Sequence, residues 1–347
     1  MPDTTEATTA PAYRLSPVHI ELPREPELLA PMPPDDFVAA VSELHDEEEA
    51  HEHVSFGMRA ASLAIVVVPF LGLVAAIVTL WGYGFGWLYL ALLVVGYILT
   101  GLGITVGFHR LATHKAFETG PVMKVIWTGL GSMAVQGPVV RWAAIHRRHH
   151  QHSDRHDDPH SPHTSGDGLK GLFKGIIHSH FGWLMRGESG QEARYAPDLL
   201  ADPVIRKSSN LFLFWVALGL LIPTVIAGVV TQSWVGAFLG FLWGGLVRVF
   251  LVHHVTWSIN SVCHLWGSRP FKHGDHSRNN AIFGILGFGE GWHNNHHAFP
   301  SSARHGLGWW QLDTSYLVIR AMSMLGLARK VRVPSRERIE AKRQGRG

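Results

Sequence analysis

The sequence predicts an all-α integral membrane protein in which four transmembrane helices form two hairpins, capped by a cytosolic helical domain. Three observations support this fold class. The 347-residue chain is 46% hydrophobic and only 16% charged, against about 25% charged in a typical soluble domain. Its apolar residues gather in four long segments, arranged as two close pairs. It has 24 histidines but a single cysteine, so a bound metal would take nitrogen ligands in place of thiolates.

The four apolar segments are long enough to cross a bilayer as helices. About 20 residues suffice for the ~30 Å hydrocarbon core, and backbone groups in lipid must be bonded within the segment, which favours helices. The first pair spans about residues 60–82 and 85–107, and the second about 211–230 and 234–252. Arg248, near the end of the last span, would either face the protein interior or extend towards the membrane surface.

The distribution of basic residues predicts the orientation of these helices. The two hairpin tips, around 82–84 and 231–233, contain no Lys or Arg, whereas residues 108–210 contain 13 and residues 328–347 contain 8. Basic loops tend to stay on the cytoplasmic side. Both termini and both His-rich regions, 108–210 and 253–327, are therefore expected in the cytoplasm.

Composition divides the chain into three regions. Residues 1–56 contain 13 Asp or Glu and only 2 Arg, are rich in proline, and are expected to be mostly disordered. Residues 57–327 are expected to form the membrane domain. Residues 328–347 are a basic tail, which is expected to anchor the chain on the cytoplasmic side or to dock a partner protein or anionic lipid.

Histidines cluster in four short motifs, all on the predicted cytoplasmic side. These are H-R-L-A-T-H from residue 109, H-R-R-H-H from 146, N-S-V-C-H from 260 and G-E-G-W-H-N-N-H-H from 289. In H-x-x-H-H the histidines lie at i, i+3 and i+4, so a helix presents all three on one face. His109 and His114 are five residues apart, or about 140° around a regular helix, which suits a helix end where the chain turns.

The spacing predicts a metal site that holds more than one ion. Two H-x-x-H-H helices facing each other would offer six imidazoles, and the nine clustered histidines exceed the three or four protein ligands of a typical zinc site. Imidazole suits Fe, Cu, Zn and Ni, so the spacing leaves the metal open. The cap is therefore expected to hold a His-rich dimetal site. Isolated histidines such as His253 and His305 are expected to be ordinary surface or core residues.

The four motifs, in this order and with hydrophobic pairs between them, resemble those of membrane fatty acid desaturases. More narrowly, they resemble the acyl-CoA delta-9 (stearoyl-CoA) type and its bacterial relatives. The resemblance covers about residues 60–310. It implies a bacterial inner-membrane enzyme with a di-iron centre that uses O2 and two electrons to form a cis double bond in a saturated acyl chain. The family's iron ligands would correspond to His109, His114, His146, His149, His150, His264, His293, His296 and His297, with Asn260 holding an iron-bound water.

The same resemblance implies residues that contact the substrate. Gln136, Trp142 and Thr256 match the family positions that bend the acyl chain, and Arg186 matches a basic position near the CoA head group. Ordinary packing is the alternative for Trp142 and Thr256. Other head-group positions depart from the animal acyl-CoA enzymes, so the resemblance implies desaturation but leaves the thioester carrier open; these positions are Gly137, Ala144 and Ile145.

Further residues are expected to orient the ligand imidazoles. Asp158 and Glu290 are carboxylates close to the histidine motifs, and His160 follows the second motif closely. Metal-bound histidines commonly donate their second ring N–H to such groups. A solvated loop position or a helix cap is the alternative for the two carboxylates.

The expected partners follow from the chemistry. The sequence shows no flavin fingerprint, haem-binding domain or cysteine cluster, so electrons are expected from an external ferredoxin, cytochrome b5-like protein or flavin/iron–sulfur reductase. A fatty acyl-CoA and membrane lipid are the other expected partners, and no nucleic acid is expected. The alternatives are an acyl-lipid desaturase, a di-iron lipid or alkane hydroxylase, and a membrane haem or metal carrier.

Overall fold

The computed structural model describes residues 56–83, 86–186 and 191–345. The expected disorder of residues 1–56 falls almost wholly outside the described residues. Within them, four helices are long and apolar enough to cross a membrane: Phe56–Leu80, Trp87–Thr113, Phe212–Thr231 and Trp234–His264. Short helices, the loops between them and two short strands form the remainder of the described residues. The predicted all-α fold with four membrane helices is therefore confirmed.

The membrane helices form along the long apolar runs, and Pro69 and Pro223 lie inside the first and third of them without ending the helix. The first pair is α2 (Phe56–Tyr83) and α3 (Trp87–Leu102), and α3 continues as a π-helix, Gly103–Thr113. The third is α11 (Phe212–Thr231). Ser233 then caps the fourth by accepting from the backbone N–H groups of Val235 and Gly236. The fourth helix comprises α12 (Trp234–Gly240), a π-helical stretch (Phe241–Val247), α13 (Arg248–Ser261) and a final 3₁₀ turn (Val262–His264).

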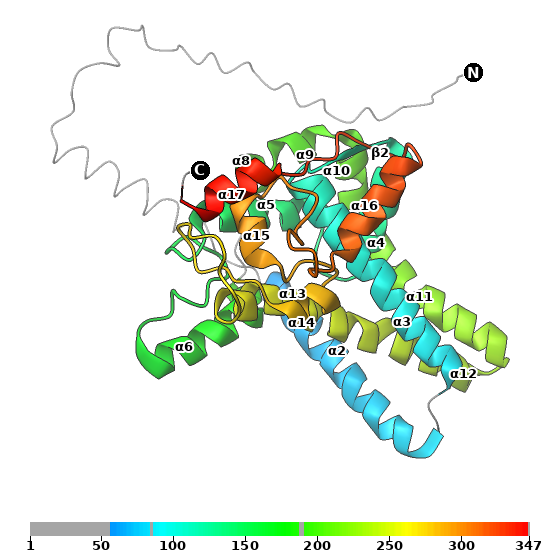
Figure 1. Cartoon of the computed structure of the whole chain (residues 1–347). Coiled ribbons are helices and arrows are strands. Elements are labelled where there is room, and N and C mark those ends of the chain that lie inside the picture. The colour runs from blue at the N-terminus through cyan, green and yellow to red at the C-terminus, as the bar shows by residue number, and fades with distance from the viewer. Residues whose placement is uncertain (1–55, 84–85, 187–190, 346–347) are drawn as a thin grey trace, which may run out of the picture. The chain divides into compact units, whose positions relative to one another are not determined.

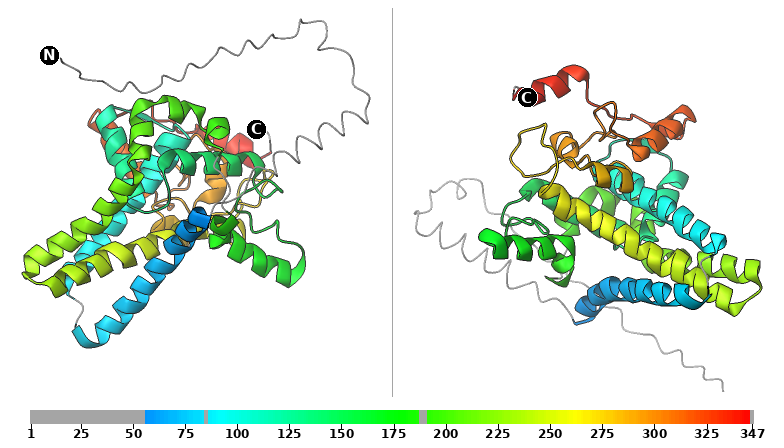
Figure 2. Two further views of the ribbon diagram at one scale, coloured as in Figure 1. Left: turned by 180° about the vertical axis from the view of Figure 1, so that it is seen from behind. Right: turned by 60° about the horizontal axis from the view of Figure 1, so that its bottom comes forward.

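The fourth membrane helix is central to the other three. Its stretch Phe241–Val247 contacts α2, α3 and α11, and Figures 1 and 2 show α2 and α3 splayed on either side of it. The fourth helix and α11 can approach each other closely because Gly244 has no side chain: a Cβ atom there would lie 2.5 Å from Pro223 Cβ of α11. The helix that carries Asn260 and His264 is therefore packed against the other three membrane helices.

The remaining elements gather at one end of the membrane helices (Figure 1). Two of them are the strands β1 (Glu118–Thr119) and β2 (Ala328–Arg329), which pair antiparallel with Glu118 opposite Arg329 and Thr119 opposite Ala328. This pairing ties the chain segment after α3 to the C-terminal segment. The others are helical: α4 (Pro121–Ser132), α5 (Val139–His152), α6 (Gly168–Ile177), a π-helical turn (His178–Gly182), α7 (Trp183–Arg186), α8 (Glu192–Tyr195), α9 (Pro197–Ala201), α10 (Pro203–Asn210), α14 (Ala281–Leu286), α15 (His293–Ala298), α16 (Thr314–Met324) and α17 (Arg336–Arg343).

Two membrane helices extend further than the hydrophobic pattern predicts. The second and fourth spans were expected to end near residues 107 and 252, but their helices continue to Thr113 and His264. The extensions carry polar and histidine side chains that are buried against the cap, among them His109 and His264. Burial against protein replaces burial in lipid, so the helical backbone continues where the apolar sequence stops.

Candidate metal centre

His109 and His114 lie together because the helix that carries them widens before it ends. A π-helix has i→i+5 hydrogen bonds, which bring residues five apart closer in angle than the about 140° of a regular helix. The His114 backbone N–H donates to the His109 carbonyl oxygen at 3.1 Å, and the two imidazole centroids are 4.8 Å apart. The pair does close a helix, as its spacing predicts. The widening that aligns the two rings is not visible in the sequence.

Helices α5 and α15 bring six more histidines to the same place. His146, His149 and His150 come from α5, and α15 supplies the other three, His293, His296 and His297. The two helices present their histidines to each other: the His150 and His297 rings stack with centroids 4.4 Å apart. Both H-x-x-H-H motifs are thus helical and mutually facing, the arrangement that their i, i+3, i+4 spacing favours.

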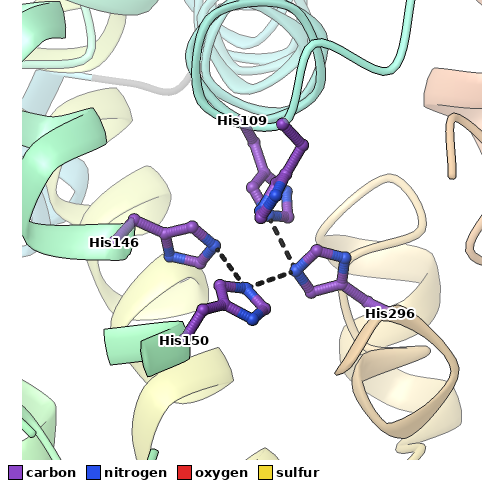
Figure 3. A group of neighbouring side chains, drawn as sticks. His109, His146, His150 and His296 are labelled. Atoms are coloured by element: carbon purple, nitrogen blue, oxygen red, sulfur yellow. Dashed lines mark hydrogen bonds between the residues drawn. The ribbon is translucent and has the colours of Figure 1, made fainter. Parts of the chain in front are cut away.

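The nine clustered histidines form two groups. In each group one ring nitrogen per histidine lies within 4.8 Å of the others. The first group has five members, of which Figure 3 shows four, and the second has four. The members are His109, His114, His146, His150 and His296 in the first group, and His149, His264, His293 and His297 in the second. Each of the helices α5 and α15 therefore contributes to both groups.

Four carboxylates fix the orientation of histidines in these groups. Each accepts a hydrogen bond from one Nδ1 atom, which places the proton on Nδ1 and leaves the Nε2 lone pair directed into the group. The pairs are His109 with Glu290 (2.6 Å), His149 with Asp158 (2.9 Å), His264 with Asp154 (2.9 Å) and His297 with Asp275 (2.7 Å).

The inward-facing nitrogens have the spacing of metal ligands. His296 Nε2 lies 3.1 Å from His109 Nε2 and 2.9 Å from His150 Nε2, and in the second group His264 Nε2 lies 3.0 Å from His293 Nε2. Ligands about 90° apart on an ion with ~2.1 Å metal–nitrogen bonds are ~3.0 Å apart. Among the described residues, the buried Nε2 atoms of His149 and His297 have no hydrogen-bond partner. Converging lone pairs repel unless a cation lies between them, so these residues fit two first-row metal ions.

Burial and neighbouring charges shift the pKa values of several rings and carboxylates of the site. Burial, reinforced by neighbouring imidazoles, holds the pKa values of His146 and His296 well below 6.5, so both are neutral ligands at neutral pH. Burial alone would raise the pKa of the Asp158 carboxyl, but His149 beside it outweighs burial and holds this pKa below its ordinary value. The site thus combines neutral donors such as His146 and His296 with charged carboxylates behind the rings, which favours a cation.

A buried arginine joins the first group to the C-terminal part of the cap. Arg110 has 0% exposure and forms ion pairs with Glu290 and with Asp313 Oδ1, the latter at 3.1 Å. It also contacts His305 Nδ1 at 3.0 Å, and the His305 ring lies 4.5 Å from that of His296. Arg110 therefore holds in place both the carboxylate that orients His109 and a histidine at the edge of the group.

A cavity of about 250 Å³ borders the first group, because His146 is one of the residues that line it. Three predicted substrate residues share its wall as a hydrogen-bonded chain: Trp142 Nε1 donates to Gln136 Oε1 at 3.3 Å, and Gln136 Nε2 donates to Thr256 Oγ1 at 2.9 Å. Trp142 stacks on His146 with centroids 5.1 Å apart. Asn260 also lines the cavity. These four side chains thus lie together at one end of the histidine cluster.

The structure places the remaining predicted residues in two different settings. His160 is buried, its ring lies 4.4 Å from that of His149, and its backbone N–H donates to Asp158; burial, with His149 next, lowers its pKa to about 3. Arg186 ends α7 at an exposed position and is not among the residues that line the cavity. The predicted metal ligands lie close together, whereas Arg186, the predicted head-group residue, does not line the cavity beside them.

Sequence reasoning missed several members of the site. Asp154 and Asp275 hold His264 and His297, but they come from loops whose spacing carries no helical or strand period. His305, expected to be an ordinary residue, lies against His109 and His296. The sequence signal that could have identified Asp154 and Asp275 is local: each of these aspartates lies next to histidines, in H-S-D and H-G-D-H.

Replacing Asp275 with asparagine tests the role of these carboxylates. The change keeps the side-chain shape but removes the charge that holds His297 Nδ1, so we expect metal affinity to fall about 10–100-fold. A chelator titration that follows retained metal measures this change. Asp157→Asn is the matched control, because Asp157 is 59% exposed and its carboxylate lies next to His152 and His156, which belong to neither histidine group. Equal metal retention by both variants would show that Asp275 has no such role.

Comparison with known proteins identifies the family. The family model described as "Fatty acid desaturase" matches residues 85–325. The chain belongs to the fatty acid desaturase family. The histidine motifs that suggested this family are therefore correctly interpreted, and the four-helix membrane fold and the buried histidine groups of this desaturase agree with it.

Two desaturases and an acetylenase are similar to this chain over most of their length. It is 45% identical over 279 residues, 80% of this chain and 87% of the relative, to hex-5-enoyl-[acyl-carrier protein] acetylenase of Moorena producens. It is 37% identical over 273 residues, 77% and 93% of the two chains, to sn-1 stearoyl-lipid 9-desaturase of Anabaena variabilis. It is 38% identical over 244 residues, 69% and 72%, to acyl-CoA C20 Delta5-desaturase of Anemone leveillei. The names of these relatives differ in the acyl carrier.

Proposed function

We propose that this desaturase holds two iron ions and uses O2 to introduce a cis double bond at the delta-9 position of a saturated acyl-CoA. The observation that carries the proposal is the pair of histidine groups beside the cavity. The reaction balances when O2, two electrons and two protons combine with the two hydrogens lost from adjacent CH2 groups, giving one C=C bond and two waters.

The residues of the chain have distinct tasks in this reaction. Bound iron supplies the O2 chemistry that an unactivated C–H bond requires. The neutral imidazoles bind the ions, and Glu290, Asp158, Asp154 and Asp275 keep the ligand rings from rotating. Preorganised ligands need no rearrangement during the reaction. Burial of the groups keeps bulk water away from the reacting atoms.

The cavity supports a bent acyl chain. A second, smaller cavity of about 30 Å³ is lined by apolar side chains, including Ile104, Val252 and Phe288, and Thr256 lines both cavities. A chain that occupies both cavities passes Thr256, to which Gln136 donates a hydrogen bond, and we place the bend of the substrate there. Holding the substrate in one bent conformation selects which carbons meet the metal centre.

Two acyl carriers have support from the wall of the larger cavity. Arg141, in the first turn of α5, lines it and provides a cation for the phosphates of CoA. Met58 and Ala61 of α2 and Phe212 of α11 also line it, so membrane helices form part of its wall. That second observation favours an acyl lipid, and we retain an acyl-lipid desaturase as the second candidate. An oxygenated product would instead indicate a hydroxylase.

The proposal includes location and electron supply. We place the cap and both termini in the cytoplasm of a bacterial cell, with the four helices in the inner membrane, on the basis of the 13 basic residues in 108–210 and the lack of any at the hairpin tips. The two electrons come from an external ferredoxin, cytochrome b5-like protein or flavin/iron–sulfur reductase.

Reconstitution with defined substrates tests the proposal. The purified full chain is loaded with iron, placed in lipid nanodiscs with ferredoxin and its reductase, and given stearoyl-CoA, stearoyl-acyl-carrier protein or a stearoyl phospholipid. We expect two irons per chain and a delta-9 monounsaturated product from stearoyl-CoA. Product from the phospholipid alone would favour the second candidate. If the chain binds iron but none of the three substrates gives an unsaturated product, desaturation of a stearoyl chain is contradicted.

A further inference from the structure

The link between α4 and α5 contains a strained residue. Val135 has φ of 62° and Gly137 has φ of 94°. Glycine adopts this left-handed region freely, but a β-branched residue there is a genuine outlier. Such a conformation persists only where the surroundings hold it. Gln136, the residue that hydrogen-bonds both Trp142 and Thr256, lies between these two positions.

Arg248 holds the beginning of this link. The side chain is 1% exposed, and its donors go to backbone carbonyls: Nη1 to Met133, Nη2 to Gly219 at 3.0 Å and Nε to Gly244 at 3.0 Å. No carboxylate pairs with it among the described residues. A buried guanidinium with carbonyl partners alone is costly to displace, because every lost bond leaves a charged donor unsatisfied. The Met133 carbonyl is therefore held firmly.

The shape of the neighbouring helices keeps the arginine and the link together. A Cβ atom on Gly219 of α11 would lie 2.9 Å from Met133 Cβ, which is closer than such atoms normally approach. A Cβ atom on Gly96 of α3 would lie 3.5 Å from Arg248 Cγ. The absent side chain at Gly219 lets α11 approach the link, and Gly96 places α3 within ordinary van der Waals range of the arginine stem.

His253 holds the next two residues. Its Nε2 lies 2.8 Å from the Ala134 carbonyl oxygen and 3.1 Å from the Val135 carbonyl oxygen, so one N–H is shared between them. The ring is 1% exposed. Arg248 and His253 both belong to α13, the helix that also carries Thr256. One rigid helix thus holds the strained backbone on one side of Gln136 and supplies the hydroxyl that its amide contacts.

We propose that Arg248 and His253 are positioning residues that keep Val135 in its left-handed conformation and thereby fix Gln136, so that they determine which carbons of the acyl chain are desaturated. This inference rests on the proposed desaturation. Without the two side chains, the strain at Val135 favours relaxation of the link, Gln136 shifts relative to Thr256, and the bend in the substrate is no longer fixed at one place.

Matched variants separate positioning from folding. His253→Leu removes the N–H donor, whereas His253→Gln retains one near the same position. Arg248→Lys keeps the positive charge but offers fewer hydrogen-bond donors. Adding Val135→Gly to Arg248→Lys removes the backbone strain that favours relaxation of the link. Val249→Ala is the packing control, because Val249 is a buried residue of the same helix with no part in these bonds. Double-bond position is mapped in the product, and hydrogen exchange is measured in residues 133–138.

The expected result is a change in the distribution of products. His253→Leu and Arg248→Lys should increase the share of displaced positional isomers about tenfold, since a shift of ~1 Å in a reacting group costs up to about 10²-fold in rate, and should speed exchange in residues 133–138. His253→Gln and the Val135→Gly rescue should restore the wild-type position, and Val249→Ala should keep it. A single unchanged position in both variants would overturn the inference. No unsaturated product from the wild type would overturn the proposed function. Unchanged hydrogen exchange of residues 133–138 in His253→Leu and Arg248→Lys would separately refute the idea that these two side chains hold Val135 in place.

Discussion

Replacement of His296 with alanine is expected to remove metal from the first histidine group and to abolish measurable product. His296 Nε2 lies 3.1 Å from His109 Nε2 and 2.9 Å from His150 Nε2, and its ring contacts that of His114 at 4.7 Å. It is the only member of this group that α15 supplies. Loss of an orienting partner alone weakens metal binding about 10–100-fold, so loss of a direct ligand should cost more.

Metal analysis and product analysis on the same preparation measure this effect. Iron per chain should fall by about one ion if each histidine group holds one. His156→Ala is the control, since the His156 side chain is 97% exposed and belongs to no group. Wild-type metal content and product in His296→Ala would contradict the assignment of the first group as a metal site.

Replacement of Arg110 with methionine should cause the largest loss of stability. The change leaves Glu290 and Asp313 buried without the cation that both contact, and removal of one partner from a buried ion pair typically costs about 3–5 kcal/mol. Burial on its own raises the pKa of Glu290, while Arg110 and His109 lower it below its ordinary value. Without Arg110, Glu290 should therefore tend to take up a proton and hold His109 less firmly.

Thermal unfolding in detergent, followed by circular dichroism, tests this second prediction. Lys330→Met is the matched control because the Lys330–Glu118 pair is largely exposed, with side chains 74% and 58% accessible, and such pairs contribute about 0–1 kcal/mol. The Arg110 variant should unfold well below the wild type while the control stays close to it. Equal unfolding temperatures for all three proteins would exclude a stabilising role for Arg110.

The features that the sequence predicted correctly are those with a local signal. Long apolar runs identify four membrane helices, and the i, i+3, i+4 spacing places His146, His149 and His150 on one side of α5. The family followed from the order of the histidine motifs. These patterns need only the geometry of one helix or one span, so no knowledge of tertiary contacts is required.

The features that escaped prediction depend on packing between distant segments. Nothing in H-R-R-H-H assigns His149 to a different group from His146 and His150, because the assignment depends on how α5 faces α15. Asp275 reaches His297 through a loop that has no period to detect. His253, expected to be ordinary, contacts a backbone more than 100 residues away. The widened helix before His114 likewise lies in a stretch that is buried against distant segments.

The sharing of α5 and α15 between the two histidine groups gives the pair a common register. Each helix sends ligand candidates to both groups, so a slip of either helix by one residue would rotate its histidines by ~100° and disrupt both groups at once. The separation between the groups is set by two backbones and not by adjustable side-chain rotamers. A movement of either helix therefore shifts both groups together, although a side-chain substitution can still affect one group alone.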